Sequence, residues 1–187
     1  MIPYIVLIIF VIIVLIINKF KSISTDYNIV LDKIHLGENE IQSLLETKTN
    51  LMDEICEYIN DMNENPVFSS IQKLSKKKYD TLNYDKDLSD IYNDLKEYLF
   101  VNKSFVPENE INDKIKELYK IEDELIATKR FYNDNSEIFN DLIDRFPANI
   151  IARKKGYEYK YTYSFGEDEF FAILKENETK HTKKARA

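Results

Sequence analysis

The stretch Tyr27–Met62, YNIVLDKIHLGENEIQSLLETKTNLMDEICEYINDM, decides the fold, because its apolar residues recur at alternating steps of three and four. This spacing is typical of a long helix that buries one seam against other helices. Gly37 and Lys48 interrupt the seam, and the turn at Asn63–Pro66 is a strong signal for the end of the helix. The apolar seam residues are Tyr27, Val30, Ile34, Ile41, Leu44, Leu51, Ile55, Tyr58 and Met62.

An unbroken apolar run, Ile2–Ile17, precedes this helix, and Lys19 and Lys21 follow the run. At ~1.5 Å per residue, a helix over Ile2–Phe20 is nearly as long as the ~30 Å hydrocarbon core of a bilayer. A cleaved signal peptide would have basic residues before the run and small residues after it, a pattern that this run lacks. We therefore predict a single-pass anchor in the cell membrane over residues 1–21. The two lysines favour an outer N-terminus and a cytoplasmic bulk.

Further helices are expected after the turn. Two short ones are predicted over Phe68–Tyr79 and Leu88–Leu99, joined at Asn83–Asp87, and a long one runs from Pro107 to Pro147. Only 3 Gly and 4 Pro occur in the chain, which disfavours a turn-rich β fold. The sequence thus predicts an all-α fold, in which the transmembrane helix is followed by a long antiparallel four-helix bundle over residues 22–156.

Polar residues occupy several seam positions of the last long helix, where apolar residues are normal. One interpretation is that the buried stripe drifts onto Tyr119 and Ile126, which leaves Glu122 and Lys129 half exposed. The other is a polar layer inside the bundle, where Glu122 meets Lys48 or Lys129. The residues of this candidate layer are Lys48, Glu122, Lys129 and Arg130.

Five aromatic residues alternate with polar residues directly after Gly156. A period of two places the five rings on one side of an extended segment. This segment either covers the bundle or inserts its rings and the nearby lysines into the lipid headgroup zone. We expect it to lead into a short helix that ends at residue 174, followed by a disordered basic tail over residues 175–187. The candidate interface residues are Tyr157, Tyr159, Tyr161, Tyr163, Phe165, Lys154, Lys155 and Lys160.

Composition disfavours several kinds of chemistry. The net charge of -7 is concentrated in the body, where residues 22–172 hold 19 basic and 31 acidic side chains, so nucleic acid is not an expected partner. Three glycines do not suffice for a phosphate-binding loop. A di-iron bundle needs two Glu-x-x-His pairs, and Glu178 with His181 is a single one. We therefore expect no catalytic residue, no metal site and no cofactor, and we interpret the chain as not an enzyme.

Between Glu122 and Tyr157 the chain has Lys129-Arg130, Tyr132-Asn133 and Phe146-Pro147 in this order. This order resembles the motifs of the LemA family of bacterial membrane proteins. Departures occur in the first long helix, where Asp53 replaces a proline and the family's tryptophan and double arginine are missing. The resemblance implies an anchored antiparallel helical bundle with no established catalytic residues. The matching residues are Glu122, Leu125, Lys129-Arg130, Tyr132-Asn133, Phe139-Asn140, Phe146-Pro147, Asn149, Ile151-Ala152 and Gly156-Tyr157.

Two classes of function fit these observations. The favoured one is a membrane-tethered, non-catalytic scaffold, whose expected partners are the lipid bilayer, an unidentified membrane or envelope protein, and a second copy of the chain. The alternative is a membrane-tethered sensor that binds a small molecule or a peptide in a polar cavity near Glu122, Lys129 and Arg130. A pocket walled by these residues would favour the sensor, whereas a filled core with an exposed apolar surface would favour the scaffold.

Overall fold

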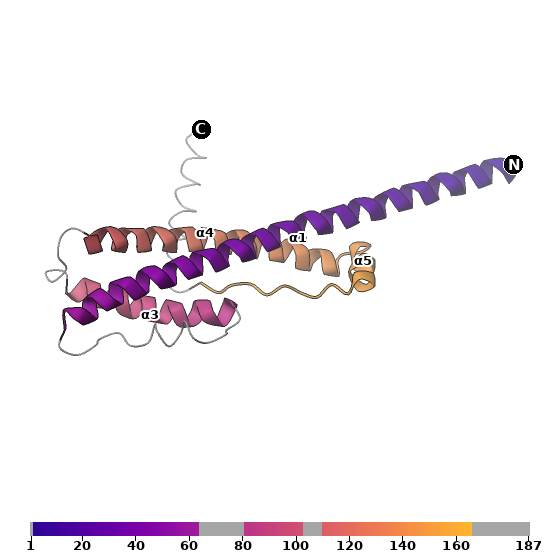
Figure 1. Cartoon of the computed structure of the whole chain (residues 1–187). Helices are drawn as coiled ribbons and strands as arrows, with labels where there is room; N and C mark the ends of the chain where they lie inside the picture. Colours follow the sequence, from indigo (N-terminus) through magenta and orange to yellow (C-terminus); the bar gives the residue numbers. More distant parts are fainter. Residues whose placement is uncertain (1, 64–80, 103–109, 166–187) are drawn as a thin grey trace, which may run out of the picture. The chain divides into compact units, whose positions relative to one another are not determined.

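The computed structural model describes residues 2–63, 81–102 and 110–165 (Figure 1). Within these residues the chain forms helices and no strand, which confirms the predicted all-α fold. The predicted helix over Phe68–Tyr79, the predicted start at Pro107 and the whole of 166–187 lie outside the described residues. The helices are α1 (Ile2–Asp61), α3 (Thr81–Val101), α4 (Glu110–Asp144) and α5 (Ala148–Lys155).

Helix α1 runs without a break from the apolar N-terminal run through the heptad seam, over 60 residues. The large apolar side chains from Tyr4 to Ile17 are all exposed, and α1 is long and apolar enough near its N-terminus to cross a membrane. The seam residues from Tyr27 to Ile55 are buried, whereas Met62 at the helix end is 40% exposed. The same helix therefore supplies both the candidate anchor and one wall of the packed core.

The chain divides into two compact units, which we describe separately. The first unit contains residues 1–38 and 130–162, and the second contains residues 39–129 and 163–187. Helices α1 and α4 contribute to both units.

In the first unit, α4 runs antiparallel to α1. The Tyr27 ring meets the Phe139 ring edge-on with centroids 5.6 Å apart, while Gly37 lies against Tyr132. A Cβ atom on Gly37 would lie 3.2 Å from the Tyr132 Cβ, which is tighter than ordinary packing. Gly37 interrupts the apolar seam because the two helices approach each other closely at this point.

Helix α5 turns the chain at the end of α4. Gly156, in the left-handed conformation with φ of 68°, ends the helix, and its N–H donates to the carbonyl of Arg153 at 3.4 Å. The Tyr157 N–H donates to the carbonyl of Ala152 at 3.0 Å, which completes a Schellman motif. The Phe146–Pro147 peptide bond before the helix is cis.

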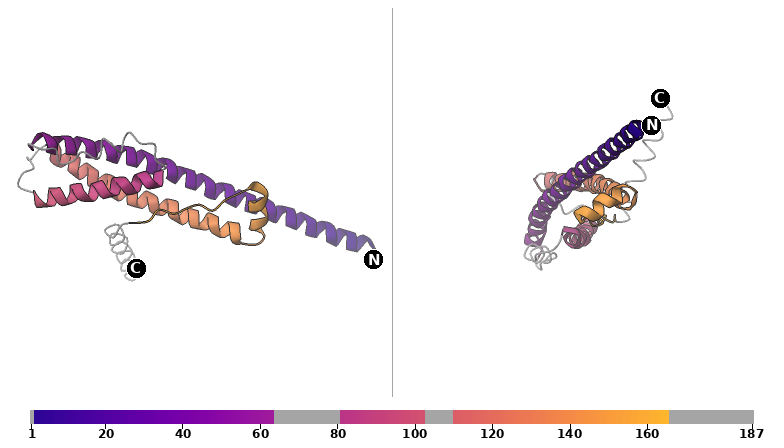
Figure 2. Two further views of the ribbon diagram at one scale, coloured as in Figure 1. Left: turned by 90° about the horizontal axis from the view of Figure 1, so that it is seen from below. Right: turned by 90° about the vertical axis from the view of Figure 1, so that its right-hand side faces the viewer.

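After α5 the chain is extended and runs back alongside α4 (Figures 1 and 2). The side-chain amide of Asn140 holds this segment at Lys160. Its Nδ2 donates to the Lys160 carbonyl and its Oδ1 accepts from the Lys160 N–H, both at 2.8 Å. One side chain thus satisfies the two backbone groups that a neighbouring strand would pair.

In the second unit, α3 runs parallel to the distal part of α1. Tyr84 and Thr49 share a hydroxyl–hydroxyl hydrogen bond of 2.6 Å, and Asn63 Nδ2 donates to the Tyr98 hydroxyl at 3.2 Å. The two residues of each pair are 35 positions apart in the chain, so α1 and α3 keep the same register over two heptads. Asn63 also donates to the Ile59 carbonyl at 2.6 Å, which ties the end of α1 to α3.

The predicted joint at Asn83–Asp87 is wrong, because α3 already begins at Thr81. The Asn and Asp residues of this stretch have low helix propensity, since their side chains compete for backbone hydrogen bonds. Within α3, however, Asp85 is buried and paired with Lys129. Tertiary contacts therefore outweigh the local preference for a joint.

The Asn140 amide generates the first prediction. Asn140→Leu removes both hydrogen bonds to Lys160, so the extended segment should detach and the free energy of unfolding should fall by about 1–3 kcal/mol. Hydrogen exchange followed by mass spectrometry in detergent should show faster exchange at the Lys160 amide. Asp141→Ala, on the exposed neighbouring side chain, is the matched control. Equal protection of Lys160 in both variants would contradict a holding role for Asn140.

Candidate functional site

Two buried ion pairs lie in the core of the second unit. Lys48 Nζ on α1 is 2.5 Å from Glu122 Oε2 on α4, and Lys129 Nζ on α4 is 2.9 Å from Asp85 Oδ1 on α3. The side chains are 0% and 11% exposed in the first pair, and 1% and 8% in the second. We call these four residues the buried charge layer, which joins three helices through two cations and two carboxylates.

An aromatic ring further stabilises one of the cations. Lys48 Nζ lies 4.4 Å from the centroid of the Tyr92 ring on α3, within the range of a cation–π interaction. Buried ion pairs of this kind add little net stability over apolar side chains of the same size, because removing the charges from water is costly. The ion pairs instead specify the register of the helices, because a helix shifted along its axis would leave a buried charge without its counterpart.

Of the predicted polar layer, the structure brings Lys48, Glu122 and Lys129 into the core of the second unit. The alternative drift of the buried stripe onto Tyr119 and Ile126 occurs only in part, because Ile126 is buried whereas Tyr119 is 41% exposed. Arg130 is half-buried and is assigned to the first unit.

Sequence reasoning missed Asp85, the fourth member of the buried charge layer. The signal that could have found it is its spacing, because Asp85 stands three residues before Leu88 and seven before Tyr92. These three residues share the buried face of α3.

The predicted interface rings do not share one environment. Tyr157 packs against the Tyr27 and Phe139 rings, with centroids at 5.1 and 5.4 Å. Tyr163 is buried and Phe165 is half-buried, whereas Tyr159 and Tyr161 are exposed. The segment therefore contributes rings both to the core and to the surface.

Tyr159, Tyr161 and Lys160 each contact α1 or α4 in the first unit. The Tyr159 hydroxyl donates to the Asp144 carboxylate, and the Tyr161 ring lies 6.0 Å from the Tyr132 ring. Lys160 Nζ is 3.7 Å from the Glu38 carboxylate, so the Lys160 side chain points toward α1. Lys154 and Lys155 are exposed at the end of α5, a different environment from that of Lys160.

The buried phenols and the single thiol remain protonated at neutral pH. Burial raises the pKa of Cys56 to about 12, with a further rise from the Asp53 carboxylate. Burial likewise raises the pKa of Tyr132 to about 12 and raises the pKa of Tyr27, whose hydroxyl donates to the Ala148 carbonyl at 3.3 Å. A neutral, buried Cys56 thiol is a poor nucleophile, because the thiolate is the reactive form.

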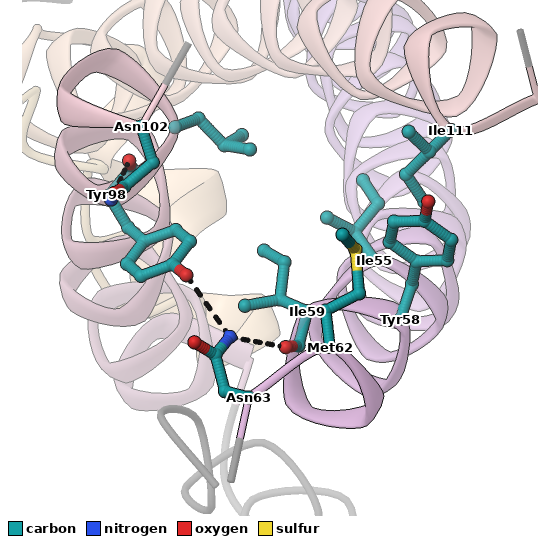
Figure 3. Close-up of a pocket in the computed structure, with 9 residues that line it drawn as sticks. Ile55, Tyr58, Ile59, Met62, Asn63, Tyr98, Asn102 and Ile111 are labelled. Atoms are coloured by element: carbon teal, nitrogen blue, oxygen red, sulfur yellow. Dashed lines mark hydrogen bonds between the residues drawn. The ribbon is translucent and has the colours of Figure 1, made fainter. Parts of the chain in front are cut away.

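A small cavity opens near the distal ends of α1 and α3 in the second unit (Figure 3). Its volume is about 20 Å³, room for roughly one water molecule. No residue of the buried charge layer lines it. Its lining residues are Ile55, Tyr58, Ile59, Met62, Asn63, Tyr98, Leu99, Asn102 and Ile111.

Side chains that could ligate a metal ion are scattered. Within 2–63, 81–102 and 110–165, no three His, Cys, Asp or Glu residues gather closely enough to hold one. His35 instead contacts the Glu38 carboxylate, with Nδ1 and Oε2 3.1 Å apart, on the exposed side of α1.

Comparison with protein families gives a match over most of the chain. The model of the LemA family covers residues 21–173, from the end of the apolar run to beyond the extended segment. The chain belongs to the LemA family. No curated protein and no solved structure matches it. LemA membership and the apolar start of α1 together fit a membrane-anchored helical protein.

The LemA-like motif residues have structural positions in this chain. Tyr132, Phe139 and Ala152 are buried in the first unit, and Asn140 holds the extended segment. Glu122 and Lys129 belong to the buried charge layer of the second unit. These motif residues therefore act in packing and in helix register.

The Lys48–Glu122 pair leads to the second prediction. Glu122→Ala leaves the Lys48 ammonium buried without its carboxylate and should lower the free energy of unfolding by about 3–5 kcal/mol. Glu124→Ala is the matched control, because Glu124 pairs with Lys120 on the exposed face of α4 and should cost at most ~0.5 kcal/mol. Chemical denaturation in detergent measures both values. Equal midpoints for the two variants would show that the pair is not required.

Proposed function

We propose that this LemA protein is a single-pass, membrane-anchored, non-catalytic scaffold that presents a helical surface to another membrane or envelope protein. The observation that carries the proposal is an apolar stripe on the exposed side of the first unit. Its members on α1, Ile29 and Leu36, are 49% and 62% exposed. Its members on α4, Phe131 and Ile138, are 38% and 49% exposed. We call these four residues the outer stripe.

The register of α1 and α4 supports a continuous outer stripe. Contacts of Tyr27 with Phe139 and of Gly37 with Tyr132 place Ile29 level with Ile138, and Leu36 level with Phe131. Each stripe residue directly precedes a buried core position of its helix. In an antiparallel pair, equivalent heptad positions face the same flank, so the four side chains share one side. Clustered exposed apolar side chains of this kind mark protein interaction sites.

The position of the outer stripe favours a partner in the same membrane. Ile29 follows Phe20 by nine residues of a continuous helix, so the stripe begins about 14 Å beyond the anchor. A partner anchored in the same bilayer would meet it there.

The buried charges of the second unit favour this scaffold over a sensor. Lys48, Glu122 and Lys129 are engaged in ion pairs with one another or with Asp85, and they do not line the cavity. A ligand would have to separate these pairs in order to bind them, at a high desolvation cost.

Site-specific photo-cross-linking in native membranes tests the outer stripe. Benzoylphenylalanine in place of Leu36 should give a discrete product with another protein, whereas the same group in place of the exposed His35 should not. His35 lies about 100° around α1 from Leu36, on the side that contacts Glu38. Ile138→Asp in the same chain should abolish the product, and Glu137→Ala should leave it intact. Identical products from both probe positions, or a product unaffected by Ile138→Asp, would contradict the proposed surface.

Labelling of a tail cysteine tests the proposed cytoplasmic orientation. In a chain with Cys56→Ser and Ala187→Cys, a membrane-impermeant maleimide should label the tail only after permeabilisation, because Lys19 and Lys21 favour the cytoplasmic side. Labelling of intact cells would establish the reverse orientation. The chain with Cys56→Ser alone controls for background labelling.

A further inference from the structure

The turn from α4 into α5 exposes an apolar pair with a basic rim. Phe146 is 76% exposed and Ile150 is 46% exposed, although both are large apolar side chains. The last turn of α5 adds three exposed basic residues, Arg153, Lys154 and Lys155. We call these five residues the α5 patch. Aromatic and aliphatic side chains beside Lys and Arg are the composition of surfaces that bind bilayers.

The α5 patch lies close to the anchor within the first unit. The Tyr27 hydroxyl donates to the carbonyl of Ala148, the first residue of α5. Tyr27 follows Phe20 by seven residues of continuous helix, a rise of about 10 Å. The Debye length is ~8 Å at physiological ionic strength. The hydrogen bond therefore holds α5 at about one Debye length from the end of the predicted membrane span.

The charges around the α5 patch favour an anionic surface. Among the described residues, no ion pair includes Arg153, Lys154 or Lys155 (the amine of Lys155 lies 5.4 Å from the Tyr157 ring centroid). Two acidic groups at the end of α4 are engaged, because Asp141 pairs with Arg145 at 4.0 Å and Asp144 accepts from the Tyr159 hydroxyl, and the exposed Glu158 leaves the patch basic by two charges. Lys19 and Lys21 add positive charge where the anchor leaves the bilayer.

We infer that the α5 patch docks on the anionic lipid surface around the protein's own anchor, with Phe146 and Ile150 in the headgroup–acyl boundary. Arg153, Lys154 and Lys155 bind the lipid phosphates. The first unit is then held to the bilayer at two places, α1 and α5. The inference rests on membrane anchoring but is independent of the outer stripe. The inference places the lipid contact on α5 and not on the aromatic segment after Gly156. Two rings of that segment pack inside the protein, because Tyr157 contacts the Tyr27 ring and Tyr163 is buried.

Tryptophan fluorescence can test the docking in the full chain, because the protein contains no Trp. Phe146→Trp and Leu36→Trp each create a single reporter, and Leu36 is the control because it is exposed on α1 but sixteen residues beyond Phe20. Each variant is reconstituted into vesicles of phosphatidylcholine and phosphatidylglycerol with brominated acyl chains. Bromine quenches only those indoles that reach the acyl boundary. Flotation of the vesicles reports insertion of the anchor separately.

Docking predicts that Phe146→Trp is quenched at least about twofold more than Leu36→Trp, and that this excess falls at high salt or without phosphatidylglycerol. The excess quenching should also fall when the three basic residues of the patch are neutralised by Arg153→Gln, Lys154→Gln and Lys155→Gln. A matched triple variant in the second unit should leave the excess quenching unchanged; its substitutions are Lys96→Gln, Lys116→Gln and Lys120→Gln. Equal quenching of both reporters in vesicles that carry the inserted protein would overturn the docking. A chain that fails to float would instead overturn the anchoring on which both proposals rest.

Discussion

The two buried ion pairs of the second unit are the constraint on which its packing depends. Apolar seams alone allow helices to slide by a heptad, because one Leu or Ile packs much like another. Lys48 and Lys129 remove this freedom, since each ammonium must meet the carboxylate of Glu122 or Asp85. Only one register of α1, α3 and α4 satisfies both pairs. The layer therefore acts on specificity more than on net stability.

In the first unit, neutral groups determine how the helices pack. Gly37 lets α1 and α4 approach closely, and the Tyr27 hydroxyl ties α1 to the start of α5. The Asn140 amide then holds the extended segment as a neighbouring strand would. These contacts orient two surfaces, the outer stripe and the α5 patch, relative to α1. Because α1 also carries the apolar run, both surfaces have a defined distance along the helix from the predicted membrane span.

The LemA motif residues of this chain have identifiable structural roles. The buried motif residues lie in packing contacts and ion pairs, and Asn140 holds the extended segment through its hydrogen bonds. Phe146 is the exception, because this motif residue is 76% exposed in the α5 patch. The other side chains available to other molecules lie outside the motif, on the outer stripe and on the basic rim of α5. This distribution, with charges paired in the core and apolar and basic side chains at the surface, is the one expected for the scaffold proposed above.

Local periodicity determined the helical architecture, the buried seam from Tyr27 to Ile55 and the end of α5 at Gly156, because each depends on residues close together in the chain. Sequence alone left the polar seam of α4 open to two interpretations and took the stretch containing Asp85 for a joint. It also predicted that the rings after Gly156 share one side. Tertiary structure decided these points, because the partners of Glu122 and Asp85, and the groups that pack on Tyr157, come from other helices. Spacing fixes which face a residue occupies, but helix register determines which charge or ring it meets there.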